Sequence, residues 1–363
     1  MRHKFAQYLR DFVIIVKELN AEMAMQYIND TLKDKKILIT GGAGFIGSNL
    51  AMYFQEHHKD AEVVVLDNFR SEKTFSNGHF KSLGHFKNLL GFKGEVIVGD
   101  ITKKEDLERL ESCRFDYIFH QAAISDTTVM DQEAILRANV NAYKDLLDLC
   151  VRHNAKMIYA SSAGVYGNSP APNSIGSGEI PENVYGFSKL MMDNLSAKYL
   201  KQFPHLHIVG LRYFNVYGQR EVYKGKTASM ILQLGLQALK NKKVRLFKMG
   251  EQKRDFVYIQ DVIQANVKAM EAKKSGVYNV GSGAARSYND IIECLKVDLG
   301  DFAVEYIENP YSFFQTHTEA NIVLTKEFLD YTPRFSLEVV VKNYINTIKA
   351  IHTSGLWNTV VGE

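Results

Sequence analysis

The chain has 363 residues, 46% of them hydrophobic and 23% charged, as in globular proteins with one large or two modest domains. Its net charge of +3 is too slight for a dedicated nucleic-acid surface, and no apolar run reaches the ~18 residues that a membrane span needs. Three scattered cysteines without CxxC spacing favour a reducing cytoplasm over a disulfide framework, and the histidines show no metal-ligand spacing.

Residues 1–34 precede the first clear strand and mix apolar with basic residues. Phe12–Val16 follows three basic residues, as in a signal peptide, but Lys17 comes at once and no small-residue cleavage site is present. We expect an N-terminal extension, helical in part, that takes no part in the chemistry. Translation could also begin at Met23 or Met25.

From Ile37 to Arg212, short apolar runs alternate with segments of helical periodicity. Continuous apolar runs are typical of a parallel sheet that is covered on both faces. The predicted strands are Ile37–Thr40, Glu62–Leu66, Glu95–Val98, Tyr117–His120, Lys156–Ala160 and His207–Arg212, and the helices between them include Lys104–Glu111 and Val140–His153. We therefore predict an α/β fold with a doubly wound parallel sheet (Rossmann) over residues 35–215.

After Arg212 the alternation breaks. Tyr217–Lys226 has the composition of a polar loop, and Ala228–Lys240 has the spacing of an amphipathic helix. Further predicted elements are strands at Lys243–Phe247, Phe256–Ile259, Gly276–Gly283 and Val304–Ile307, and a closing helix at Leu337–His352. We expect residues 216–363 to form a smaller, interleaved α/β substrate-binding domain, with segments around 243–283 returning to complete the first domain.

The first strand runs into Thr40-Gly-Gly-Ala-Gly-Phe-Ile-Gly47 and then into a helix. Gly41 permits a tight turn, Gly44 lets the backbone approach a pyrophosphate, and Gly47 allows close helix packing. The unpaired N–H groups of the helix N-terminus then face the phosphates. The second strand leads to Asp67, 20 residues after Gly47, where a carboxylate can hold ribose hydroxyls. This order predicts a dinucleotide site rather than an ordinary glycine turn.

A second constellation follows the fifth strand. Tyr185 and Lys189 are four residues apart, so on a helix they share one face. An ammonium beside a phenol favours the phenolate, so we expect Lys189 to lower the pKa of Tyr185 towards neutrality and make it a general acid/base. Ser162, at the strand end, can hydrogen-bond the same substrate hydroxyl. A YxxxK pair alone also occurs on solvated helix faces, but with the glycine turn, Asp67 and Ser162 the catalytic interpretation is favoured.

Over about residues 35–350 the chain resembles the extended short-chain dehydrogenases/reductases that act on nucleotide sugars. The motifs that carry the resemblance are Thr40–Gly47, Gly99-Asp100, His120-Gln-Ala-Ala123, Tyr185-x3-Lys189 and Arg212-Tyr-Phe-Asn-Val-Tyr-Gly218. Three further stretches, Ala123–Thr128, Arg212–Gly225 and Lys253–Tyr258, are most similar to the branch that epimerises ADP-heptose at C6. The resemblance implies a cytoplasmic, homo-oligomeric isomerase that uses bound NADP and supplies heptose for the lipopolysaccharide core.

The resemblance also implies which residues contact the cofactor. Asp67 by itself suits NAD, because a carboxylate repels a 2′-phosphate, but Arg70 could offset the repulsion and admit NADP. The implied cofactor positions are Gly41, Gly44, Phe45, Ile46, Gly47, Asp67, Asn68, Arg70, Asp100, Ile101, Gln121, Ala122, Ala123, Ile124, Ser125, Asn139, Lys189 and Val216.

In this family pattern Tyr185, with Lys189 and Ser162, is the first acid/base group and Lys224 is the second. Lys224 suits the role if burial near Arg220 or Arg254 lowers its pKa. The implied substrate positions are Ser125, Asn215, Lys226, Gln233, Phe247, Arg254 and Phe314, with Arg254 placed to bind a diphosphate.

Three positions depart from the family pattern. Lys226 stands where a serine is usual, and Gln219 stands where a proline is usual. The substrate tyrosine falls on Phe314, or on Tyr311 if the register slips. These departures affect the sugar contacts rather than the reaction class.

Other interpretations remain open for several residues. Lys224 could be a loop lysine in solvent or on a phosphate, and Arg254 could pair with Asp255 or Glu251. Asp126 could cap a helix, and Arg286 could be a surface arginine rather than a phosphate ligand.

Three other functions are alternatives to a 6-epimerase. A UDP-hexose 4-epimerase is the nearest alternative. A 4,6-dehydratase is disfavoured, because Ala163 and Gly164 stand where its acidic residues would be. A redox-sensing regulator without catalysis would not need Tyr185 and Lys189.

Overall fold

The computed structural model describes residues 25–308 and 315–361. The strands are β1 (Lys36–Thr40), β2 (Glu62–Asp67), β3 (Glu95–Val98), β4 (Tyr117–His120), β5 (Lys156–Ser162), β6 (Ile208–Tyr213), β7 (Asn215–Tyr217), β8 (Lys243–Phe247), β9 (Lys253–Tyr258), β10 (Gly276–Val280), β11 (Ala285–Ser287) and β12 (Ala303–Ile307). The helices are α2 (Phe45–His57), α3 (Lys104–Glu108), α4 (Gln132–Leu136), α5 (Ala142–His153), α6 (Val184–Gln202), α7 (Met230–Asn241), α8 (Ile259–Ala269), α9 (Tyr288–Leu299), α10 (Val323–Leu329), α11 (Leu337–Ser354) and α12 (Leu356–Val361). Shorter 3₁₀ segments include Phe86–Leu89, Ala163–Tyr166 and Val222–Thr227, and a π-helical segment, Arg137–Asn141, precedes α5.

Seven parallel strands form the central sheet, in the order β10-β6-β5-β4-β1-β2-β3. Leu38 of β1 pairs with Val64 of β2 on one side and with Ile118 of β4 on the other. The predicted parallel sheet is confirmed, and its six predicted strands begin and end within two residues of those observed. The seventh strand, β10, comes from the second half of the chain and pairs with β6.

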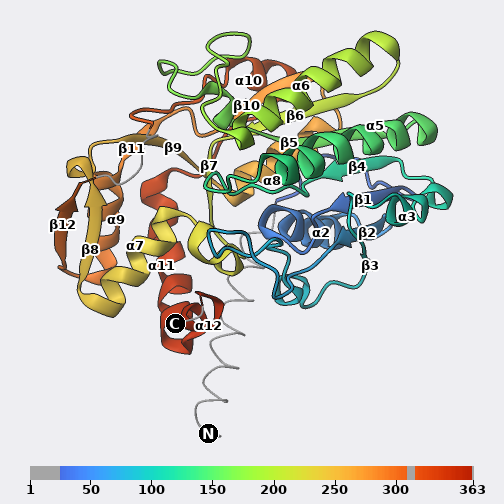
Figure 1. Ribbon diagram of the computed structural model, residues 1–363. Helices are drawn as coiled ribbons and strands as arrows, with labels where there is room; N and C mark the ends of the chain where they lie inside the picture. Colours follow the sequence, from blue (N-terminus) through green and yellow to red (C-terminus); the bar gives the residue numbers. More distant parts are fainter. Residues whose placement is uncertain (1–24, 309–314, 362–363) are drawn as a thin grey trace, which may run out of the picture.

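The two faces of the sheet are covered by different helices. Ile37 and Ile39 enter a core shared with α2 and α8, whereas Leu38 enters a core shared with α5 and α6. Strand side chains alternate between faces, so an apolar run such as 37–39 fits a sheet buried on both sides. Figure 1 shows this layered part beside a smaller lobe that contains β8, β12, α7 and α9.

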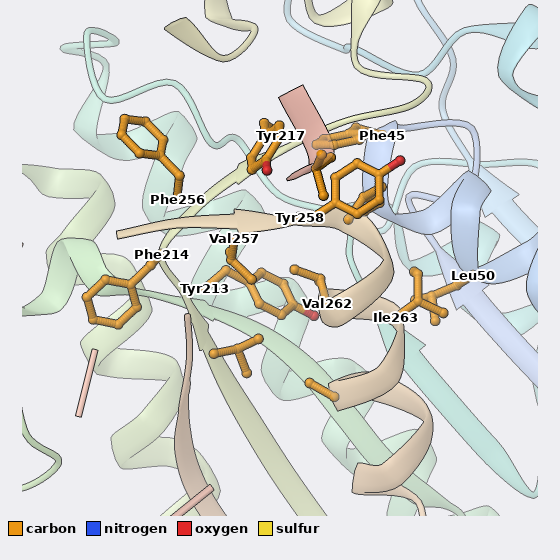
Figure 2. Packing of buried hydrophobic residues seen from close by; sticks show 14 of the residues in the cluster. Phe45, Leu50, Tyr213, Phe214, Tyr217, Phe256, Val257, Tyr258, Val262 and Ile263 are labelled. Atoms are coloured by element: carbon orange, nitrogen blue, oxygen red, sulfur yellow. The ribbon is translucent and has the colours of Figure 1, made fainter. Parts of the chain in front are cut away.

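Two small sheets lie outside the central sheet, one between the lobes and one within the smaller lobe. Strands β11, β9 and β7 form one of them, and β12 and β8 form the other. Figure 2 shows aromatic side chains of β6, β7 and β9 gathered beside Val262 and Ile263 of α8 and near Phe45 of α2. The core therefore continues from the central sheet beneath the segments that cross to the smaller lobe. The division at residue 215 stays a prediction.

The segment predicted as a polar loop, Tyr217–Lys226, has only turns and a 3₁₀ segment after Tyr217, but it is largely buried. Glu221 has no exposed surface and accepts hydrogen bonds from the Gly218 N–H, the Ser229 N–H and the Tyr344 hydroxyl. A buried carboxylate requires such donors, and Tyr344 lies far along the chain. Composition within the segment could not reveal them.

The described part of the N-terminal extension, residues 25–34, contains no helix, and the expectation that the extension is helical in part stays a prediction. Tyr27 instead stacks on Tyr53 of α2, with ring centroids 5.4 Å apart, and Leu32 is buried. Residues 1–24 lie outside the described residues. Across the described ranges, none of the helices is both long enough and apolar enough to traverse a bilayer.

Candidate active site

A cavity of about 440 Å³ opens at the carboxyl ends of the central strands. Ligands of open α/β sheets bind at this edge. It is lined by all four predicted catalytic residues, Ser162, Tyr185, Lys189 and Lys224, and by sixteen of the predicted cofactor positions, Gly41, Gly44, Phe45, Ile46, Gly47, Asp67, Asn68, Asp100, Ile101, Gln121, Ala122, Ala123, Ile124, Ser125, Lys189 and Val216. A larger hollow of about 1010 Å³, between α2 and α11, holds none of them, so it is not the site of the predicted chemistry.

The glycine turn forms a close backbone cradle. Gly41 has φ +69°, and a Cβ atom there would lie 2.6 Å from the Ala122 nitrogen. At Gly47 an added Cβ would lie 2.3 Å from the Gly41 oxygen. No side chain caps the N-terminus of α2, so its first N–H groups are open to an anion. These features fit the pyrophosphate of a dinucleotide.

Asp67 lies at the end of β2, beside this cradle. Its carboxylate accepts hydrogen bonds from the Ala43 N–H at 3.0 Å and the Phe69 N–H at 2.8 Å. Burial raises its pKa, and the two N–H bonds oppose that shift. Lys81 and Ser82, which sequence reasoning missed, line the cavity with Asp67; no motif marks them, because a loop brings them there.

Two predicted cofactor residues do not line the cavity. Arg70 donates to the Tyr223 carbonyl, and its guanidinium lies 4.6 Å from the centroid of the Phe80 ring. Asn139 is fully buried and bonds the Ile124 N–H at 2.9 Å and the Ser188 hydroxyl at 2.9 Å. Asn139 therefore stabilises Ile124 in the cavity wall without facing the cavity itself.

The tyrosine side of the cavity consists of the start of α6 and the end of β5. The Asn183 side chain caps α6 by accepting from the Gly186 N–H at 2.8 Å. A Cβ atom on Gly186 would lie 2.4 Å from the Gly164 oxygen, so glycine allows the helix to approach the strand end. As a result, Tyr185 reaches the Ser162 hydroxyl and forms a hydrogen bond with it.

Lys189 lies one turn further along α6. Its Nζ donates to the Ala160 carbonyl at 2.7 Å and lies 5.8 Å from the centroid of the Tyr185 ring. Burial lowers the pKa of Lys189 to about 8, and nearby Asp193 opposes the shift.

The expectation that Lys189 lowers the pKa of Tyr185 is wrong in this structure. Burial raises the pKa of Tyr185, and only the hydrogen bond to Ser162 opposes the rise. The Lys189 ammonium bonds to a carbonyl rather than to the phenol, so desolvation of the phenolate dominates. The tyrosine is therefore held as a phenol that can donate its proton.

The lysine side of the cavity is the 3₁₀ segment Val222–Thr227. Lys224 is partly buried and its Nζ lies 5.5 Å from the centroid of the Phe45 ring. The solvated-loop alternative is therefore wrong. Burial lowers the pKa of Lys224, and Glu221 opposes the shift.

The predicted lowering and its predicted cause, burial, are confirmed, but neither Arg220 nor Arg254 contributes to the shift. The Arg220 guanidinium donates to the Asn88 carbonyl at 2.6 Å, and that of Arg254 donates to the Gln315 carbonyl at 2.7 Å. Desolvation, rather than a neighbouring arginine, lowers the pKa of Lys224.

The predicted substrate residues divide into two groups. Ser125 and Asn215 line the cavity. Lys226 and Gln233 line a separate hollow of about 300 Å³ near α12. Phe247, at the end of β8, and Arg254, buried on β9, line neither hollow. Phe314 and Tyr311 lie outside the described residues.

Two residues left open by the sequence have structural partners. Asp126 accepts from the Thr128 N–H at 2.8 Å and pairs with His79. Arg286 pairs with Glu338 at 2.8 Å on the surface. No group of three His, Cys, Asp or Glu side chains is placed to bind a metal ion within residues 25–308 and 315–361.

Comparison with known proteins adds to this geometry. Residues 37–281 match the NAD dependent epimerase/dehydratase family. A curated relative from Alkalilimnicola ehrlichii, an ADP-L-glycero-D-manno-heptose-6-epimerase, is 33% identical over 328 residues, which are 86% of this chain and 97% of the relative. The crystal structure of the Helicobacter pylori ADP-L-glycero-D-manno-heptose-6-epimerase is 59% identical, with a TM-score of 0.83, and covers 90% of this chain and 100% of that one. A UDP-glucuronic acid 4-epimerase from Bacillus cereus, in complex with UDP-glucuronic acid and NAD, is 30% identical, with a TM-score of 0.74 and coverage of 87% and 99%.

Proposed function

The chain belongs to the NAD dependent epimerase/dehydratase family, and from that premise we propose that it is an ADP-L-glycero-D-manno-heptose 6-epimerase. Relatives of that name at 33% and 59% identity support the proposal. The observation that carries it is that Tyr185 and Lys224, from two separate segments, line one cavity. Two acid/base groups in one cavity suit a reaction that inverts a carbinol carbon.

Family membership, the glycine cradle and the uncapped start of α2 support a nicotinamide dinucleotide as the cofactor. When bound, it would supply the hydride acceptor and donor that reversible oxidation of a sugar carbinol requires. The residues that would hold it are the turn from Gly41 to Gly47, Asp67 and Lys189.

The side chains of the cavity would handle the proton of the sugar hydroxyl. In one epimer, Tyr185 and Ser162 bond the C6 oxygen, and the Tyr185 phenol donates its proton to it; in the reverse direction the phenolate takes that proton back. The C6 oxygen of the other epimer points elsewhere, so a single tyrosine cannot serve both. Lys224 takes or returns the proton there, and its lowered pKa favours the neutral amine that can take it.

We further propose NADP rather than NAD. Lys81 and Ser82 line the cavity, and Gly84, shortly after them, lies against the Asp67 carboxylate. A lysine there would offset the repulsion between the carboxylate and a 2′-phosphate. Arg70 does not line the cavity and gives this proposal no support. Mass spectrometry of the nucleotide extracted from the purified protein tests it, and finding only NAD would contradict it.

We also infer a homo-oligomeric enzyme of the cytoplasm that contributes to lipopolysaccharide heptose supply. The names of the relatives support the substrate, and the free thiols of Cys113, Cys150 and Cys294 suit a reducing compartment. Light scattering during gel filtration tests the oligomeric state, and a monomer would contradict that inference.

The decisive experiment incubates the protein with ADP-D-glycero-β-D-manno-heptose and follows the configuration at C6 by NMR, with UDP-glucose as the control substrate. We expect inversion at C6 and no conversion of UDP-glucose. Inversion of UDP-glucose at C4 alone would favour the alternative, a UDP-hexose 4-epimerase. In D₂O the C6 position should gain no deuterium, because neither Tyr185 nor Lys224 exchanges the hydrogen on carbon. Deuterium at C6 would indicate proton abstraction from carbon instead.

A further inference from the structure

Residues 69–89, here called the strap, run from the end of β2 to the segment that carries Lys224, here called the lysine turn (residues 220–227). We propose that Arg70 and His85 of the strap are positioning residues that hold Lys224 in the cavity and connect its position to the glycine turn. This inference rests on the proposed role of Lys224 as an acid/base group. It assigns to Arg70 a function other than contact with the cofactor.

The first contact is made by Arg70. Its guanidinium donates to the Tyr223 carbonyl, which belongs to the peptide group that leads into Lys224. The Phe80 ring lies against the guanidinium, 4.6 Å from its centroid, and limits its movement. Arg70 has no carboxylate within 4.0 Å in the part of the chain that the structure describes. The Tyr223 carbonyl is therefore an acceptor that this partly buried charge requires.

The second contact is made by His85. Its ring stacks on the Tyr223 ring, with centroids 4.0 Å apart and planes 9° from parallel. The backbone N–H of His85 donates to the Ala43 carbonyl at 2.9 Å, and Ala43 lies inside the glycine turn. One strap residue thus touches the glycine turn with its backbone and the lysine turn with its side chain.

A third set of contacts joins the lysine turn to the strap and the strap to the glycine turn. Arg220 of the lysine turn donates to the Asn88 carbonyl of the strap at 2.6 Å, and the Asn88 side chain donates to the Ala43 carbonyl at 3.1 Å. Lys224 itself lies over Phe45, the first residue of α2. The glycine turn, the strap and the lysine turn therefore form a closed ring of contacts, so displacing the strap should displace Lys224.

The lysine turn also has anchors that do not involve the strap. Glu221 bonds Ser229 and Tyr344, on the side of the smaller lobe. Loss of the Arg70 bond should therefore leave the fold intact and release only the cavity side of the turn. This separation makes the inference testable in a folded protein.

The first test measures the reactivity of Lys224 in the absence of substrate and added cofactor. Wild type, Arg70→Met, Arg70→Lys and the control Arg152→Met, an exposed arginine on α5 that pairs with Glu111, are labelled with limiting acetic anhydride and analysed by mass spectrometry. We expect labelling of Lys224 to rise about tenfold in Arg70→Met, the effect of losing one charge-assisted hydrogen bond. Arg70→Lys should restore part of the protection, and Arg152→Met should match wild type. Unchanged labelling of Lys224 in Arg70→Met would overturn the inference.

The second test separates positioning from cofactor contact. If Arg70 positions Lys224, Arg70→Met lowers kcat more than it changes KM, and the affinities for NADP and NAD keep their wild-type ratio. If Arg70 instead binds a 2′-phosphate, the variant loses NADP affinity selectively and Lys224 labelling stays low, which overturns the inference. His85→Leu, which removes the ring stacking and the hydrogen bond from the Lys87 N–H to the imidazole, provides the same labelling readout if Arg70→Met does not fold. A wild type that fails to invert ADP-heptose would count against the proposed function, while the labelling still tests the position of Lys224.

Discussion

The two sides of the cavity are built differently. On the tyrosine side, Tyr185, Lys189 and Ser162 come from one helix and the strand end packed against it. On the lysine side, Lys224 is held by the strap, and the bond from Arg70 to Tyr223 joins residues 153 positions apart. Regular secondary structure converts sequence spacing directly into geometry. Contacts between distant loops depend on the whole fold, so the lysine side should be the more adjustable of the two.

The largest effect is expected from Tyr185→Phe. Removing the phenolic hydroxyl should cut kcat by roughly 10²- to 10⁴-fold, the usual contribution of a general acid/base group. Bound nucleotide should be retained, since the glycine turn and Asp67 are unchanged. Steady-state kinetics tests this, with Tyr199→Phe near the other end of α6 as the control. Near-normal turnover would show that Tyr185 only packs on its helix.

Lys224→Met should give a somewhat smaller loss. The variant keeps the length of the side chain but has no amine, so kcat should fall by roughly 10²-fold while KM changes little. Lys240→Met on α7 serves as the matched control. If Lys224→Met epimerises at the normal rate, the lysine side does not take part in the chemistry. The cavity would then have one catalytic side rather than two.

A buried histidine near Lys189 of the tyrosine side should make the stability of the protein depend on pH. His120, at the end of β4, is fully buried and bonds the Thr40 hydroxyl at 2.7 Å. Burial lowers its pKa from 6.5 to about 3, with Lys189 adding to the shift. Between pH 6.5 and 3, His120 is therefore protonated in the unfolded chain but neutral in the folded protein. The free energy of unfolding keeps its full value above pH 6.5 and falls as the pH drops towards 3.

The expected loss by pH 5 is about 2 kcal/mol. Urea unfolding at several pH values measures this loss. In His120→Asn, the free energy of unfolding should depend less steeply on pH between pH 6.5 and 3. An unchanged slope in the variant would assign the pH dependence to other groups.

The smallest effect is expected at the cap of α6. Asn183→Ala removes the acceptor for the Gly186 N–H and should cost about 1 kcal/mol of stability. Because the rest of α6 still packs on β5, kcat should change less than in either acid/base variant. Thermal unfolding combined with kinetics tests this. A loss of kcat as large as that of Tyr185→Phe would show that the tyrosine side is no more rigid than the lysine side.

The sequence predicted the tyrosine side well because its spacing is local. The strands, the glycine turn, Asp67 and the pair Tyr185 and Lys189 follow from periodicities of two and four residues and from the order of elements. The spacing of Ser287 and Asp290 also marks the start of α9, where the two residues form a capping box.

What the sequence could not predict depends on long-range packing. Arg70 was expected to face the cofactor, but Tyr223 and Phe80 direct its guanidinium elsewhere. Glu221 belongs to a polar stretch of the sequence, and one of the donors that allow its burial is the hydroxyl of the distant Tyr344. The pKa of Tyr185 follows the burial of the whole cavity rather than the proximity of one lysine.

The pairing of β10 with β6 has a consequence for the folding of the chain. During synthesis, the outer backbone groups of β6 have no partner in the sheet until residues 276–280 emerge. Until then β6 is an exposed strand edge, which can pair with other chains and cause aggregation. A fragment that ends before β10 should therefore be poorly soluble even though it holds the whole glycine turn and Tyr185. The nucleotide-binding half should therefore not fold as an independent domain, because the last strand of its sheet comes from the second half of the chain.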